Sequence, residues 1–291
     1  MPSSPILTVG IFSRPRRADL ADVVPALLEW LSTRGYRALY DTETADALND
    51  GNPDGLGRAQ LVADSDLLLV LGGDGTLLAA AREAAPRGIP VLPVNLGSLG
   101  FLTSFTLEEL YPALEETLAG RAEASERVML TASLIRHGQV VESKNVLNEA
   151  VINKGALARM IEVELSIDGD FVCRYRADGL IVATPTGSTA YNLAASGPIL
   201  YPDLDVLLLC PICPHSLVQR PLVLPTFEVI EVEVLKPSPS ALLCVDGHVA
   251  QTLHSGDRIA VRRAEEQPKL LMDSNHTYYQ VLQNKLKWGG S

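Results

Sequence analysis

One short stretch places a carboxylate among glycines where a strand meets a helix. Residues 72–76 read Gly-Gly-Asp-Gly-Thr, directly after the apolar residues 67–71. Glycines beside a helix N-terminus let a phosphate approach unpaired backbone N–H groups closely. A carboxylate repels phosphate, so we expect Asp74 to accept a proton or help to hold a metal. An ordinary strand-to-helix turn is the alternative. The other residues of this predicted phosphate loop are Gly72, Gly73, Gly75 and Thr76.

Two common phosphate loops do not fit this stretch. The Rossmann fingerprint requires a glycine where the chain has Leu78. A P-loop requires a Gly-Lys pair, and the sequence contains none. The loop therefore belongs to another class of phosphate-handling protein.

A second run joins an apolar strand to a turn of small hydroxylated residues. Residues 184–189 contain only Thr, Pro, Gly and Ser, and Tyr191 follows. Such a turn offers N–H and hydroxyl groups to a phosphate or ribose, and Tyr191 is suited to stack on a base. Asn148 and Glu149 interrupt another apolar run, where buried polar groups need partners such as sugar hydroxyls. A surface turn and a strand end are the alternative interpretations.

The elements that must position these residues begin with repeated β-α-β units. In an open parallel sheet, the loops at 72–76 and 95–102 would both lie at the carboxyl ends of strands, where ligands bind. Residues 41–57 are polar, glycine-rich and aperiodic, which predicts a loop. Thr106 and Glu109 have the spacing of a capping box. Strands are expected at 6–12, 36–40, 67–71 and 89–94, and helices at 18–32, 76–83 and 106–118.

From about residue 121 the apolar period changes to two, which is typical of strands. Asp168-Gly169 and Asp246-Gly247 are turn signals, and residues 278–288 predict a final helix. We therefore expect an α/β N-terminal domain with a parallel-type sheet, residues 1–121, and an all-β domain, residues 122–270. The C-terminal tail 271–291 is expected to join the first domain. The clearest strands of the second are 128–135, 161–167, 227–235 and 258–263.

Composition limits the function classes. The 291 residues are 47% hydrophobic and carry a net charge of −11, which argues against general nucleic-acid binding. We expect no signal peptide and no membrane-spanning segment, and therefore a cytoplasmic protein. Cys210 and Cys213 form a C-x-x-C pair without the second pair that zinc requires. Their apolar and proline neighbours favour buried free thiols, and we assign no metal-ligating residues.

The order and spacing of these motifs resemble the bacterial NAD kinases over almost the whole chain. The Gly-Gly-Asp-Gly-Thr loop alone also resembles lipid kinases and phosphofructokinase-type kinases. The run 184–191 together with Asn148-Glu149 is specific to NAD kinases. The matching stretches are 72–76, 95–102, 148–149, 178–191, 214–217, 220–222 and 285–289.

The resemblance implies roles for individual residues. Asp74 matches the catalytic base that deprotonates the adenosine ribose 2′-hydroxyl of NAD, and Gly75 lies beside the dinucleotide. Asn148 and Glu149 match the pair that holds ribose hydroxyls. The other implied NAD-binding residues are Arg159, Arg176 and Asp178, partly across a subunit interface, then Thr189, Ala190, Tyr191, Asn192, Leu193 and Ala194 in the adenosine-side turn, and His248.

The resemblance also implies a β-sandwich for the second domain and a homo-oligomer, either dimer or tetramer. The function it implies is transfer of the terminal phosphate of ATP, with Mg²⁺, to NAD to make NADP. An arginine at position 176 resembles the family members that use NAD rather than NADH. The alternatives are a lipid or sugar kinase that shares the glycine loop, or a non-catalytic dinucleotide-binding regulator. The acidic charge argues against a lipid kinase, and Asp74 argues against a pure binder.

Overall fold

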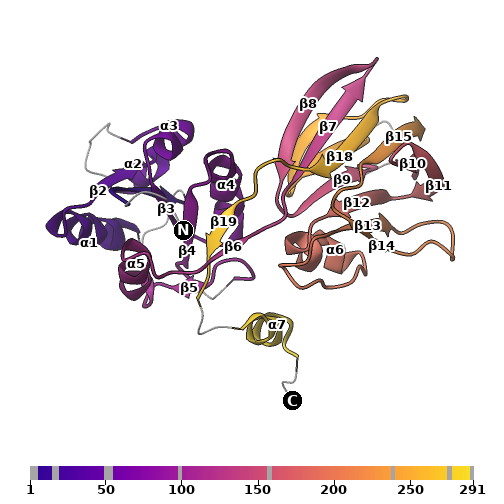
Figure 1. The fold of residues 1–291 in the computed structure, drawn as a ribbon. Helices are drawn as coiled ribbons and strands as arrows, with labels where there is room; N and C mark the ends of the chain where they lie inside the picture. Colours follow the sequence, from indigo (N-terminus) through magenta and orange to yellow (C-terminus); the bar gives the residue numbers. More distant parts are fainter. Residues whose placement is uncertain are drawn as a thin grey trace. The chain divides into compact units, whose positions relative to one another are not determined.

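The chain forms two compact units that we describe separately. The computed structural model describes residues 6–14, 20–48, 55–97, 100–155, 159–236, 240–273 and 277–288. Unit 1 comprises Met1–Glu126 and Glu266–Ser291, and unit 2 comprises Arg127–Glu265. In Figure 1 the yellow strand β19, near the C-terminus, lies within the sheet of the N-terminal residues.

Unit 1 is built on a seven-stranded sheet in the order β2-β1-β3-β4-β19-β6, with β5 also paired to β4. All its pairs are parallel except β19 with β6. Central β3 is buried along its whole length, as its unbroken apolar run predicts. The strands are β1 (Thr8–Ser13), β2 (Arg37–Tyr40), β3 (Leu67–Leu71), β4 (Pro90–Asn95), β5 (Phe105–Thr106), β6 (Ala124–Glu126) and β19 (Lys269–Leu271).

The helices of unit 1 include one that the sequence interpretation missed. Residues 41–57 were predicted to be a loop, but α2 forms within them. The Asp41 carboxylate accepts the Thr44 N–H at 2.9 Å and so caps the helix. The helix is short and has no apolar stripe, so periodicity alone does not predict it. The helices are α1 (Leu20–Thr33), α2 (Thr42–Leu48), α3 (Arg58–Ala63), α4 (Asp74–Ala84), the 3₁₀ turn η1 (Ala85–Arg87), α5 (Leu110–Leu118) and α7 (Tyr278–Leu286).

Helix α5 begins one turn later than predicted. Thr106 belongs to β5, and its N–H and hydroxyl both donate to the Glu109 carboxylate, at 2.7 and 2.8 Å. Half of the predicted capping box therefore forms. Because Thr106 is held in the sheet, it closes a turn before the helix rather than capping it. The predicted helix is therefore present, but the prediction that it begins at Thr106 is wrong.

Unit 2 consists of two six-stranded antiparallel sheets. Its short helical segments are η2 (Thr186–Thr189) and α6 (Tyr191–Ala194). Sheet I has the order β11 (Asp170–Ala177), β10 (Ile161–Ile167), β15 (Ile230–Lys236), β18 (Arg258–Arg263), β7 (Leu130–Arg136), β8 (Gln139–Val146). Sheet II has the order β14 (Leu222–Pro225), β13 (Val206–Ile212), β12 (Gly179–Ala183), β9 (Glu149–Asn153), β16 (Leu242–Val245), β17 (His248–Thr252).

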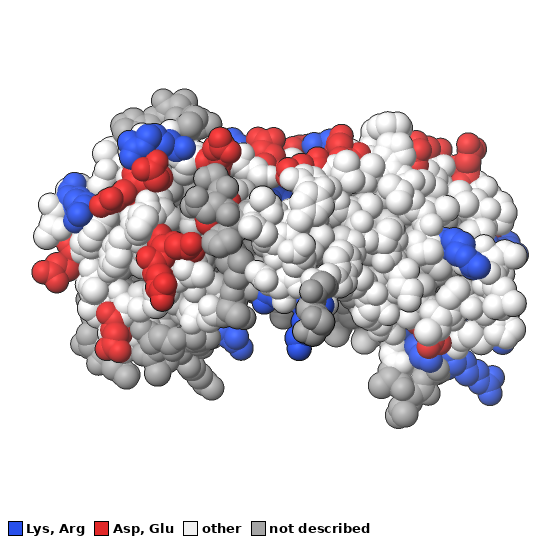
Figure 2. Space-filling view, turned by 90° about the horizontal axis from the view of Figure 1, so that it is seen from below, with Lys and Arg blue, Asp and Glu red and all other residues white. Residues whose placement is uncertain are grey.

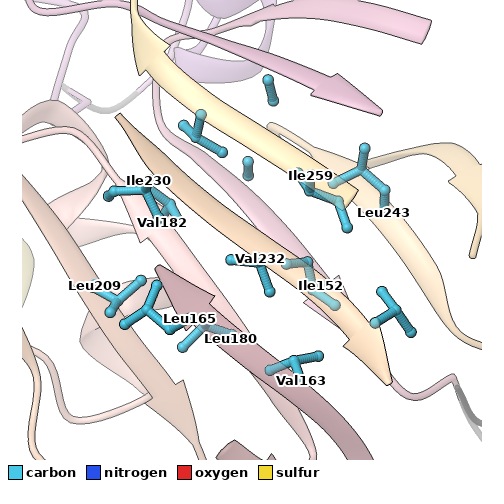
Figure 3. Close-up of a cluster of buried hydrophobic side chains, with 14 of the residues drawn as sticks. Ile152, Val163, Leu165, Leu180, Val182, Leu209, Ile230, Val232, Leu243 and Ile259 are labelled. Atoms are coloured by element: carbon cyan, nitrogen blue, oxygen red, sulfur yellow. The ribbon is translucent and has the colours of Figure 1, made fainter. Parts of the chain in front are cut away.

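The core of unit 2 lies between these two sheets. Figure 3 shows Val163, Val232 and Ile259 of sheet I among Ile152 and Leu180 of sheet II. Alternate residues of β10, β15 and β7 are buried, so each strand turns one face to the core. The α/β unit followed by an all-β sandwich confirms the predicted fold class.

On the face drawn in Figure 2, the Lys and Arg side chains of the described residues form no continuous patch. None of the helices in the described part of the chain has the length and apolar character needed to cross a membrane. Asp168 and Asp246 have φ of 50° and 45°, each followed by a glycine near 80°, as the predicted tight hairpin turns require.

Candidate functional site

Asp74 is held by the loop that follows the next strand. The carboxylate accepts backbone N–H groups from three consecutive residues: Phe101 donates to Oδ2 at 3.0 Å, and Leu102 and Thr103 donate to Oδ1 at 3.2 Å. The Thr103 hydroxyl adds a fourth bond, to Oδ1, at 3.2 Å. Since Oδ1 has three donors and Oδ2 one, Oδ2 is the oxygen that retains capacity to accept a proton.

The two glycine-bearing loops of the sequence meet at this carboxylate. They follow β3 and β4, which are parallel neighbours, so both lie at carboxyl ends of strands. The Asn95 amide donates to Thr103 Oγ1 at 2.7 Å, and the Gly100 N–H donates to the same oxygen at 3.0 Å. A Cβ on Gly100 would lie 2.0 Å from Asp74 Oδ1, so only glycine fits. Ser98 and Leu99 lie outside the described residues.

The glycines of the phosphate loop differ in whether neighbouring atoms leave room for a side chain. A Cβ on Gly72 would lie 2.6 Å from Thr76 Oγ1, so packing within the loop explains that glycine. A Cβ on Gly73 or Gly75 would meet nothing within 4 Å. Gly73 has an extended φ of −92°, which any residue adopts. The open space beside Gly73 and Gly75 is what a closely approaching ligand needs.

In unit 2, Asn148 and Glu149 lie where β9 begins. Asn148 Oδ1 and Glu149 Oε2 are buried and have no hydrogen-bond partner among the described residues. The backbone beside them is fixed, because the Asp246 carboxylate accepts the N–H groups of Leu147, Asn148 and Glu149 at 3.1, 2.8 and 3.2 Å. Two unpaired acceptors on a fixed backbone suit a ligand that donates hydrogen bonds, such as the hydroxyls of a sugar.

Glu149 carries a perturbed carboxyl. It is 5% exposed, and burial together with the charge of Asp246 raises its pKa from 4.5 to about 7, although the Tyr191 backbone N–H donates to it. Loss of hydration disfavours the charged form, and a neighbouring like charge disfavours it further. A perturbed pKa beside unpaired acceptors is typical of a functional site.

The sequence predicted that the hydroxyl groups of residues 184–189 bind a ligand, but two of them form hydrogen bonds within the protein. Thr184 Oγ1 donates to the Leu147 carbonyl at 2.6 Å and accepts the Gly187 N–H at 3.1 Å. Ser188 Oγ accepts the Leu200 N–H at 3.0 Å. The Thr184 hydroxyl therefore ties the turn to the residues before β9, and the Ser188 hydroxyl ties it to the chain after α6. In the described part of the chain Thr186 Oγ1 is buried without a hydrogen-bond partner, so this hydroxyl remains for a ligand.

The residues after this turn form α6. Tyr191 is 39% exposed, so its ring is accessible for stacking. The buried Asn192 amide donates to the carbonyls of Ser188 and Pro198, both at 3.0 Å, which gives this predicted ligand residue an internal role as well. Thr189, Ala190 and Leu193 are half-buried, and Ala194 is exposed.

The structure does not bring all the predicted NAD-binding residues together within one chain. Asp178 precedes β12, at the end opposite to the turn at Thr184, and the four residue steps of that strand span about 13 Å. The Asp178 carboxylate pairs with Lys154 at 2.8 Å. Exposed Arg176 belongs to β11, and Asp178 lies between β11 and β12. Exposed Arg159 precedes β10, also away from Glu149.

Sequence reasoning missed the role of Asp246. The Asp246-Gly247 pair was interpreted only as a turn. The local sequence does not distinguish its role from that of the Asp168-Gly169 turn. Its partners lie nearly a hundred residues earlier, and only the pairing of β16 with β9 brings them together. His248 begins β17 two residues later and is exposed.

The cysteines agree only partly with expectation. All four are free, but only Cys210 is buried, and Cys213 is exposed. The prediction that both thiols of the pair are buried is therefore wrong for Cys213, which lies in a loop with φ of 45°. Among the described residues, no three His, Cys, Asp or Glu side chains gather as metal ligands would.

Comparison with known proteins decides the family. A profile of the ATP-NAD kinase N-terminal domain matches residues 9–122, and one of the ATP-NAD kinase C-terminal domain matches residues 147–272. The chain belongs to the ATP-NAD kinase family. Membership makes it a phosphotransferase with NAD kinase activity, as the motifs implied. ATP is the donor of this family.

Individual members of the ATP-NAD kinase family align over nearly the full length. The NAD kinase of Koribacter versatilis (strain Ellin345) is 47% identical over 283 residues, which are 97% of this chain and 98% of that protein. The NAD kinase of Solibacter usitatus (strain Ellin6076) is 44% identical over 284 residues, 98% of each chain. These relatives give no support to the lipid-kinase, sugar-kinase or regulator alternatives.

Two solved structures of NAD(H) kinases share the fold. Yeast NADH kinase complexed with NADH has a TM-score of 0.90 and 28% identity, and the match covers 99% of this chain and 90% of that chain. An NAD kinase from Archaeoglobus fulgidus in complex with ATP has a TM-score of 0.74, with coverage of 96% and 98%. At 24% identity the second comparison supports the fold alone.

Proposed function

We propose that Asp74 is the general base that takes the proton from the 2′-hydroxyl of the adenosine ribose of NAD as that oxygen attacks the terminal phosphate of ATP. The observation that carries this proposal is the fixed Asp74 carboxylate, which leaves Oδ2 as the accepting oxygen. Phosphoryl transfer needs alignment and charge stabilisation more than covalent chemistry. Gly73, Gly75 and the start of α4 would supply N–H groups to the phosphates.

Unit 2 supplies the proposed dinucleotide contacts. Asn148 and Glu149 would accept hydrogen bonds from ribose hydroxyls, since one oxygen of each is buried and unpartnered. Tyr191 would stack on the adenine, with the rest of the turn 189–194 and His248 lining the nucleotide. This division of roles follows the two domains that we propose from the sequence, residues 1–121 with 271–291 and residues 122–270.

The positions of Arg159, Arg176 and Asp178 support a shared site. They lie away from Glu149 within one chain, which fits the proposal that they complete the NAD site of a neighbouring subunit. We therefore propose a homo-oligomer, either dimer or tetramer, acting in the cytoplasm.

We also propose that catalysis requires a divalent cation, Mg²⁺ by preference. The described residues offer no cluster of three or more metal ligands, so they do not fit a resident metal. A cation carried by the ATP phosphates suits such a protein, since Mg²⁺ binds through substrate phosphates and few side chains.

The test is a direct assay of the purified chain with NAD, ATP and Mg²⁺, in which NADP is measured with an NADP-specific dehydrogenase. Asp74→Asn should lower kcat by about 10²–10⁴-fold and keep the fold. Asp66→Asn is the matched control: Asp66 precedes the same strand at its other end, and its carboxylate accepts the Leu7 and Thr8 N–H groups at 2.9 Å. An Asp74→Asn protein with the parent rate would remove the proposed base.

A further inference from the structure

The Asp246 carboxylate fills a concavity of backbone N–H groups. Its Oδ1 accepts from Asn148 and Glu149 at 2.8 and 3.2 Å, and its Oδ2 accepts from Leu147 at 3.1 Å. Successive N–H groups that converge in this way bind anions. Here the chain supplies its own anion from a distant hairpin, so the start of β9 has a fixed conformation before any ligand binds.

The hairpin itself is anchored to the same strand. The Asp246 N–H donates to the Glu149 carbonyl at 3.0 Å, while the Asp246 side chain accepts the Glu149 N–H. Bonds in both directions therefore fix the backbone of Glu149. Asp246 is 8% exposed and adopts φ of 45°, which is the turn conformation that aims its side chain at β9.

We propose that Asp246 is a positioning residue for the dinucleotide: it fixes the start of β9 so that Asn148 and Glu149 present their unpartnered oxygens to the ribose. This inference rests on the proposed NAD site. The carboxylate does not reach the ligand itself in this proposal; it acts through the three N–H groups that it holds.

The charge of Asp246 gives this role a measurable signature. Glu149 is faced by the Asp246 carboxylate from the β16–β17 turn and by the Tyr191 N–H from α6, and Asp246 is the charged group that raises its pKa. In the parent protein NAD binding should strengthen as pH rises through about 7, because the ionised carboxyl is the better acceptor. Without the Asp246 charge this rise should occur at lower pH.

The decisive variant is Asp246→Asn in the full chain. The Asn oxygen can still accept two N–H groups, but its NH₂ group would face the third donor. We expect the Kd for NAD, measured by calorimetry at several pH values, to rise about tenfold or more, as when a charge-assisted hydrogen bond is lost. We also expect kcat to change less than about twofold and the pH midpoint of binding to fall. The lower midpoint reports the loss of the Asp246 charge, and the higher Kd at nearly unchanged kcat reports the loss of positioning; a merely structural role would lower Tm without raising the Kd of the folded protein.

Asp168→Asn is the matched control. Asp168 has φ of 50° in an equivalent Asp-Gly hairpin of the same unit, and its carboxylate accepts the N–H of Val229, just before β15, at 2.8 Å. This bond and a backbone bond join Asp168 to Val229, which is not a predicted NAD-binding residue, so Kd and its pH midpoint should stay at the parent values. An Asp246→Asn protein that binds NAD like the parent at every pH would overturn the inference. A parent chain that makes no NADP would instead overturn the proposed function.

Should Asp246→Asn fail to fold, hydrogen exchange in the parent chain decides. The amides of Leu147, Asn148 and Glu149 should exchange as slowly as those in the middle of β9. Binding of NAD should slow exchange at Asn148 and Glu149 further. Exchange at the rate of an exposed loop, or exchange that NAD does not change, would contradict the positioning role.

Discussion

Replacing Glu149 by Gln is expected to stabilise the folded protein, and by more at alkaline than at acidic pH. The parent carboxyl has a pKa of about 7 in the fold, against its usual 4.5. Between these values the folded state binds a proton that the unfolded state releases, so the free energy of unfolding falls as pH rises from 4.5 to 7. Gln does not titrate. The variant should therefore gain about 1 kcal/mol at pH 5 and about 3 kcal/mol at pH 8.

Thermal unfolding of the two proteins without NAD measures this gain. At roughly 2–4 °C per kcal/mol, Tm should rise by about 3 °C at pH 5 and about 10 °C at pH 8. Glu265→Gln, at an exposed glutamate of the same unit, is the control and should leave Tm unchanged. A Glu149→Gln protein with equal shifts at both pH values, or with none, would refute the reasoning. Weaker NAD binding by this variant would show that the carboxyl is retained for function at a cost in stability.

Three further predictions concern catalysis and assembly. Gly100→Ala should lower kcat roughly 10²-fold, since its Cβ would meet Asp74 Oδ1 at 2.0 Å and displace the base. Gly57→Ala is the control and should keep the parent kcat, because a Cβ there meets nothing within 4 Å. Equal kcat values for the two variants would contradict this prediction. Arg176→Gly should relax the preference for NAD over NADH, and an unchanged ratio of kcat/KM values would remove this role. Specific activity should fall on dilution, and mixing inactive Asp74→Asn and Asp178→Ala proteins should restore activity; a fully active monomer would contradict a shared site.

Local sequence was sufficient where one short segment determines the structure. The uninterrupted apolar run of β3 and the alternation in β7 and β10 predicted those strands, because burial on one or two faces leaves a direct pattern. It failed at α2, where a side-chain cap rather than an apolar stripe forms the helix. It also failed at Thr106, where pairing with β4 overrides the capping signal.

The candidate site shows the same division. Asp74 was found from its neighbours, since a carboxylate between glycines is unusual in a phosphate loop. The three N–H groups that hold it come from the loop after β4, and those that Asp246 holds come from the start of β9 and the two residues before it. Such contacts depend on strand order, which composition and periodicity do not specify. The hydroxyls of Thr184 and Ser188 were misassigned for the same reason, because their partners lie elsewhere in the chain.

The order of strands in unit 1 has a consequence for synthesis of the chain. Strand β19 lies between β4 and β6, so the sheet of unit 1 is completed by residues that leave the ribosome after all of unit 2. Domains made first generally fold first, but here β6 pairs with β19 and therefore waits for residues 269–271. Unit 2 is continuous in sequence and has no such delay. Until β19 arrives, the beginning of β4 is an unpaired edge on which a second nascent chain can add a strand.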